Sequence, residues 1–123
     1  MKLADYERRV AAAMRAKDPV AAMRAIDPNV DADGVRMTAL IVARLRFERL
    51  LRGSPEAEAS FDRDAAAFAE TFGRYHADVP PRAFFPADEA ALFDAWRDRI
   101  AAPPPERSRI VAPRRARRRR SRR

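Results

Sequence analysis

Aromatic residues are concentrated in one segment of this 123-residue chain. Eight of the ten Phe, Tyr and Trp residues lie between positions 61 and 96: Phe61, Phe68, Phe72, Tyr75, Phe84, Phe85, Phe93 and Trp96. Large aromatic side chains bury more apolar area per residue than aliphatic ones. Because 27 of the apolar residues are Ala, which favours helix but buries little area, the core is expected to form around the aromatic segment.

The spacing of apolar residues predicts an all-α fold, a small bundle of five to six short helices. Apolar residues recur at three- and four-residue steps between Asp-Pro, Ser-Pro and Gly signals that begin or end helices. The expected helices span residues 3–17, a short segment after Pro19, and residues 35–52, 55–61, 65–76 and 87–100. Together they predict one helical domain over residues 1–100.

The 35–52 helix is expected to be central, because it is apolar around much of its circumference. Its main stripe comprises Met37, Leu40, Ile41, Phe47 and Leu51, and Gly53 is interpreted as its C-cap. Four arginines on this helix do not share one face: Arg44, Arg46, Arg49 and Arg52. We interpret them as solvated side chains with buried stems rather than as a phosphate-binding row.

The basic charge of the chain lies in its C-terminal segment. Residues 1–100 contain 16 Lys and Arg against 17 Asp and Glu, whereas residues 101–123 contain ten Arg and one Glu. After a Pro-rich spacer, the like-charge block PRRARRRRSRR cannot bury a core, so residues 101–123 are predicted to be a disordered tail. Multiple Arg side chains on such a tail favour nucleic-acid binding without sequence preference. The predicted contacts are Arg114, Arg115, Arg117, Arg118, Arg119, Arg120, Arg122 and Arg123.

Three alternatives for the tail stay open. The near absence of Lys and the many Ala residues suggest a GC-rich bacterial genome, so the tail can reflect codon bias with no dedicated partner. Anionic lipid is a second alternative, although only Ile110 and Val111 offer apolar anchors. An acidic patch on a partner protein is the third.

The proline-rich segment from Val79 to Pro86 carries two adjacent aromatic residues, Phe84 and Phe85. The favoured interpretation is that this loop folds back and plugs the end of the bundle. The alternative is an exposed patch that docks a partner protein.

The sequence predicts no enzyme, no cofactor and no metal site. His76 is the only histidine and the chain has no Cys. A His–Asp pair of His76 with Asp78 or with the acidic Asp88-Glu89 is conceivable as a general base. The preferred interpretation is that His76 ends its helix as a cation that suits the helix dipole. The chain shows no signal peptide and no apolar run of membrane-spanning length, so a cytoplasmic location is expected.

Residues 39–81 resemble a bacterial family of small helical domains to which DNA binding is ascribed. The matching positions are Ala39, Ala43, Phe47, Leu50, Leu51, Phe61, Phe68, Tyr75 and Pro80-Pro81, while the family's Tyr-Arg-Asn-Asn-type run is missing. The resemblance implies a helical fold and a DNA partner.

The sequence as a whole leads to two hypotheses on function. The first is a non-enzymatic interaction module with a nucleic-acid-binding tail. The second is an adaptor or immunity-type accessory subunit that docks a protein through its helical body and Phe84-Phe85, with the tail incidental.

Overall fold

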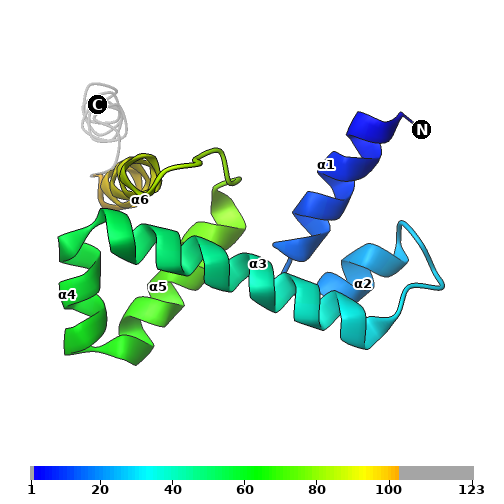
Figure 1. Cartoon of the computed structure of the whole chain (residues 1–123), viewed down its shortest axis with the longest axis horizontal. Coiled ribbons are helices and arrows are strands. Elements are labelled where there is room, and N and C mark those ends of the chain that lie inside the picture. Colours follow the sequence, from blue (N-terminus) through cyan, green and yellow to red (C-terminus); the bar gives the residue numbers. More distant parts are fainter. Residues whose placement is uncertain (1, 103–123) are drawn as a thin grey trace, which may run out of the picture.

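A computed structural model describes residues 2–102 and confirms the all-α fold: these residues form six helices and no strand. The helices are α1 (Leu3–Met14), α2 (Pro19–Arg24), α3 (Ala32–Gly53), α4 (Pro55–Arg63), α5 (Ala65–Asp78) and α6 (Pro86–Ala101). Helix α3 runs along the molecule, with α1 and α2 against its N-terminal half and α4, α5 and α6 around its C-terminal half (Figure 1). The predicted tail from residue 103 onward lies outside the described residues.

Four helices begin at a side-chain cap, although α3 begins at Ala32, three residues before the start expected from the sequence. The side chain at each N-cap accepts a hydrogen bond from the backbone N–H three residues later, satisfying one of the unpaired donors of the first turn. These caps are Asp18, Asp31, Ser54 and Asp64. Proline occupies the first position of α2, α4 and α6, where its missing N–H costs nothing.

Gly53 is the last residue of α3, and the prediction that it is the C-cap is wrong, because Ser54 occupies that position. No glycine among the described residues has a positive φ. A Cβ at position 53 would instead lie 2.0 Å from the carbonyl oxygen of Pro86 and 2.3 Å from its carbonyl carbon. Gly53 is therefore required by the close approach of the α3 and α6 backbones.

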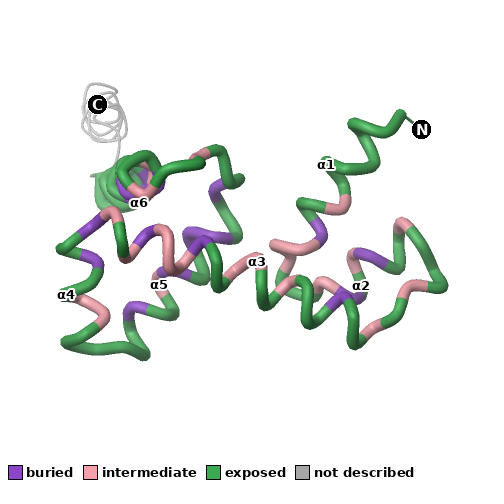
Figure 2. The backbone as a smooth tube through the Cα atoms, viewed as in Figure 1, coloured by how far each residue is buried: buried purple, intermediate pink, exposed green. Residues whose placement is uncertain are grey.

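The buried residues form two separate clusters along α3 rather than one core, and Figure 2 marks the positions of buried residues along the backbone in purple. The large cluster contains most of the aromatic segment, as expected: Leu50, Ala57, Phe68, Phe72, Tyr75, Val79, Ala90, Phe93 and Trp96. The small cluster lies at the N-terminal end of α3 and comprises Ala13, Val20, Met23 and Val35. Helix α3 is thus central, but it joins two clusters.

The middle of α3 exposes apolar side chains that the sequence predicts to be buried. Met37, Leu40 and Ile41 of the predicted stripe are exposed, as is Leu45, whereas Phe47 and Leu51 pack against the large cluster. The difference arises because α1 and α2 cover one end of α3 while α4, α5 and α6 cover the other. Even so, none of the helices described has both the length and the apolar character needed to cross a membrane.

Candidate functional site

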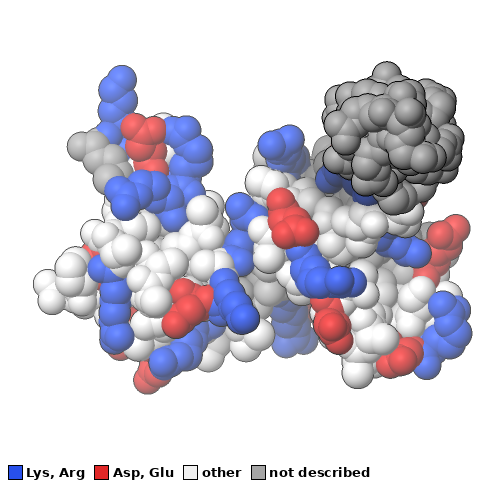
Figure 3. Space-filling view, turned by 180° about the vertical axis from the view of Figure 1, so that it is seen from behind, with Lys and Arg blue, Asp and Glu red and all other residues white. Residues whose placement is uncertain are grey.

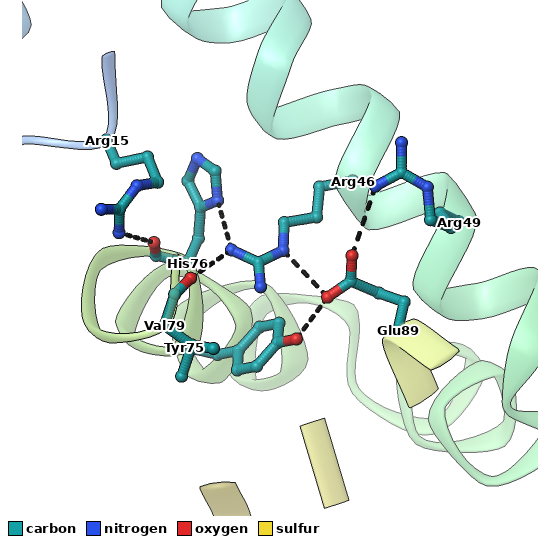
Figure 4. A network of polar contacts seen from close by, with 7 residues as sticks. All are labelled: Arg15, Arg46, Arg49, Tyr75, His76, Val79 and Glu89. Atoms are coloured by element: carbon teal, nitrogen blue, oxygen red, sulfur yellow. Dashed lines mark hydrogen bonds and ion pairs between the residues drawn. The ribbon is translucent and has the colours of Figure 1, made fainter. Parts of the chain in front are cut away.

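Arg46 lies at the centre of a buried polar network between α3, α5 and α6 (Figure 4). Its Nε donates to Glu89 Oε2 at 2.9 Å, and its Nη1 donates to the carbonyl oxygen of Val79. Its guanidinium carbon lies 4.4 Å from the centre of the Tyr75 ring, a cation–π contact. With 2% of its surface exposed, Arg46 is no solvated arginine, so the interpretation of the four arginines is wrong for this residue.

Glu89 is the anion of this Arg46 network and is fully buried. It accepts hydrogen bonds from Arg46, from Arg49 Nη1 at 3.3 Å and from the Tyr75 hydroxyl. Burial raises the pKa of Tyr75, and the hydrogen bond to Glu89 raises it further. The Tyr75 hydroxyl therefore keeps its proton and acts as a hydrogen-bond donor, so that one carboxylate links residues of three helices.

His76 is a buried neutral side chain, which corrects the prediction that it acts as a cation at the end of α5. Only 7% of its surface is exposed, its ring stacks on Phe72, and its Nδ1 lies 3.4 Å from Arg46 Nη1. Burial, followed by the charges of Arg46 and Arg15, lowers its pKa from 6.5 to about 4, against the opposing effect of Glu89. The cation near the end of α5 is instead Arg15, whose Nη1 donates to the carbonyl oxygens of His76 and Ala77.

The Arg46 network is suited to holding helices together rather than to acid–base chemistry. Glu89 is the acidic residue of the network, but Arg46 contacts both Glu89 and His76, and no hydrogen bond joins these two side chains in the part of the chain described. Asp78 accepts a hydrogen bond from Trp96 Nε1 instead of pairing with His76. Ser54 caps α4, and Ser60 accepts a hydrogen bond from Arg63, so neither is placed as a nucleophile beside His76. Within residues 2–102, no group of three or more His, Asp and Glu side chains could hold a metal ion.

The proline loop between α5 and α6 exposes both of its aromatic residues. Phe84 is 88% exposed and Phe85 is 68% exposed, so the prediction that they plug the bundle is wrong. Phe85 is the N-cap of α6, where its carbonyl oxygen accepts from the N–H groups of Asp88 and Glu89. These two hydrogen bonds fix the backbone of Phe85 at the start of α6, while the rings of Phe84 and Phe85 face solvent.

The eight tail arginines, from Arg114 to Arg123, lie outside the described residues, so the structure places none of them relative to the Arg46 network or to the loop. Comparison of the chain with protein-family models, curated proteins and solved structures gives no match. The resemblance of residues 39–81 to a DNA-binding family therefore stays a prediction.

The lowered pKa of His76 makes folding stability dependent on pH. Between pH 6.5 and about 4 the unfolded chain protonates this histidine while the folded protein keeps it neutral. The contribution of neutral His76 to folding stability is therefore fully present above pH 6.5 and is lost as the pH falls toward 4. This loss lowers the free energy of unfolding by about 3 kcal/mol.

Urea unfolding of the wild type and of His76→Asn over this pH range isolates that contribution from the carboxylates. The Asn side-chain oxygen can accept from Arg46 as Nδ1 does, but it does not titrate. We expect a shallower pH dependence in the variant, and parallel curves for the two proteins would contradict the assignment.

Proposed function

We propose that this protein is a non-enzymatic adaptor that binds a partner protein through the exposed proline loop. The exposure of Phe84 and Phe85 carries the proposal. Two adjacent rings in water are costly to maintain, and aromatic residues are enriched among the side chains that dominate binding energies at protein interfaces. The prolines on both sides of the rings restrict the backbone, so less conformational entropy is lost on binding.

The charge of the chain favours a different protein as the partner over a second copy. The net charge is +8, so two copies repel each other, whereas a partner with an acidic surface is attracted. The helical body itself is close to neutral, and Lys and Arg are interspersed with Asp and Glu on the face displayed in Figure 3. The contact at the loop is therefore expected to be apolar, with a pocket on the partner that accepts the two rings.

Replacing both Phe84 and Phe85 with Ala tests this proposal. We expect an unchanged Tm, because the rings are exposed, and an affinity for the partner at least 100-fold weaker, because each buried ring contributes about 2 kcal/mol or more. The partner is identified by photocrosslinking from position 84 and purified, and its binding to both proteins is measured by titration calorimetry.

The double variant Leu40→Ala/Ile41→Ala is the matched control, since it removes exposed apolar side chains from α3 and leaves the loop intact. Equal binding by the Phe variant would refute docking through the loop. Concentration-dependent dimers of the wild type that disappear in the Phe variant would identify a second copy as the occupant and would refute the partner proposed here.

A second candidate function, binding of nucleic acid by the tail, is favoured by the separation of charge along the chain. Ten of the Arg residues follow position 100, where only one acidic residue accompanies them. A chain segment of this kind binds phosphates mainly by releasing counterions.

Deletion of residues 106–123 tests the tail directly. We expect the full-length chain to bind duplexes of unrelated sequence equally, with an affinity that falls steeply between 50 and 200 mM salt, on the order of 10³-fold if six phosphates are contacted. The truncated chain is expected to lose this binding. Fluorescence anisotropy of both proteins at several salt concentrations makes the comparison, and equal binding by the truncated chain at low salt would exclude the tail as the binding element.

A further inference from the structure

A groove of about 540 Å³ lies between the C-terminal end of α1, the middle of α3 and the second half of α5. Its small side chains, among them Ala39 and Ala43, leave room between the helices, and His76 and Arg15 line it. We propose that this groove binds a small amphiphilic carboxylate, with its oxyanion at His76 and Arg15 and its apolar part along α3.

The first observation is the unpaired nitrogen of His76. Arg46 Nη1 can only donate, so His76 Nδ1 must accept, and the proton of the neutral ring is on Nε2. That Nε2–H is buried and has no acceptor among the described residues. A buried donor without an acceptor is destabilising, and a ligand oxygen that accepts from it would offset this cost. In Figure 4, Nε2 lies on the side of the ring away from Arg46.

Arg15 supplies a second donor of the same kind. Its Nη1 donates to the backbone carbonyl oxygens of His76 and Ala77, so its guanidinium is held at the end of α5, and Arg15 lines the same groove as His76. Its Nε is buried and also lacks an acceptor among residues 2–102. Two N–H donors on residues that line the same groove can each donate to an oxygen of a carboxylate. Both nitrogens lie beneath the groove surface, so a bound oxyanion must displace a lining side chain to reach them.

The rest of the groove determines the class of anion. Lys17 and Arg74 add positive charge to that of Arg15, and Glu70 is the single acidic residue of the lining. Apart from these groups the surface is mainly apolar, with Met14 and Leu40 as its larger side chains. Inorganic phosphate has no apolar body to cover this surface, whereas a monocarboxylate with an aliphatic or aryl body satisfies both the donors and the apolar surface.

Octanoate is the probe, titrated into the full chain with ¹⁵N NMR detection of the His76 ring and with calorimetry. We expect one site, a large shift of the Nε2–H signal, and affinity at least tenfold weaker for octanol, which has no charge. Inorganic phosphate is expected to bind more weakly than octanoate. Absence of a His76 shift, or equal binding of octanol, would refute the proposal, and tighter binding of phosphate would refute the carboxylate assignment.

Variants test the two sides of the site. His76→Asn removes the Nε2 donor and is expected to weaken octanoate binding at least tenfold. Should that variant not fold, the double variant Lys17→Ala/Arg74→Ala changes only exposed groove residues and is expected to weaken binding several-fold. Arg24→Ala, an exposed cation outside the groove lining, is the control and should bind normally. Undiminished binding by the folded groove variants would overturn the assignment.

Discussion

Gly53→Ala is expected to destabilise the protein by about 3 kcal/mol, which corresponds to roughly 12 °C or more in Tm for a domain of this size. The new Cβ would lie 2.0 Å from the carbonyl oxygen of Pro86, far inside van der Waals contact. The clashing Pro86 atoms belong to the backbone at the start of α6, so no side-chain rotation relieves the clash. Helix α6 must shift away from α3, and this shift disturbs the Arg46 network and the large cluster together.

Gly73→Ala is the matched control, measured with Gly53→Ala by urea unfolding and calorimetry. Gly73 lies inside α5, and an added Cβ would meet no atom within 4 Å. The same substitution should there stabilise the protein by up to about 1 kcal/mol, because Ala is the better helix former. If both variants were equally stable, the close approach of α3 and α6 would be contradicted.

Glu89→Ala is expected to cost 3–5 kcal/mol, on the order of the effect of leaving a buried charge without its partner. Arg46 would keep its positive charge with 2% of its surface exposed, and the Tyr75 hydroxyl would lose its acceptor. The double variant Arg46→Met/Glu89→Leu is expected to recover most of this loss, since it removes both charges and keeps apolar volume. Chemical unfolding of the single and double variants measures the coupling directly.

Glu48→Ala is the control for a solvent-exposed pair. Glu48 accepts from Arg44 at 3.3 Å on the surface of α3, and such pairs contribute about 0–1 kcal/mol. A Glu89→Ala effect no larger than that of Glu48→Ala would show that the Arg46 network contributes little to stability.

The starts of α2, α4 and α5 were predictable because they depend on local chemistry, whereas α3 begins three residues before its expected start and α1 ends three residues before its expected end. Asp18, Ser54 and Asp64 each accept from the N–H three residues later, and a proline directly follows Asp18 and Ser54. The composition of the large cluster was likewise predictable from the helical spacing of Phe68, Phe72 and Tyr75. The exposure of Phe84 and Phe85 was not predictable, because helical periodicity gives no information on whether the side chains of a loop between helices face the core or the solvent.

Helical periodicity indicates that Arg46 and Glu89 are buried, but their charge makes both residues look like surface residues. Glu89 lies four residues before Phe93 and seven before Trp96, so helical periodicity places it on the buried face of α6. Arg46 has the same relation to Leu50 on α3. Charged residues are seldom buried unless paired, and the two partners are 43 positions apart, so sequence periodicity could suggest burial of each but not their contact.

The two clusters along α3 give the protein two levels of stability. Nine buried residues and the Arg46 network hold α4, α5 and α6 to one end of α3, whereas four smaller buried residues hold α1 and α2 to the other. We therefore expect the N-terminal helix pair to open at a lower free energy than the C-terminal half. Such an opening would withdraw Arg15 from the carbonyl oxygens at the end of α5, so we expect the affinity of a ligand in the groove to depend on how often the first two helices are closed.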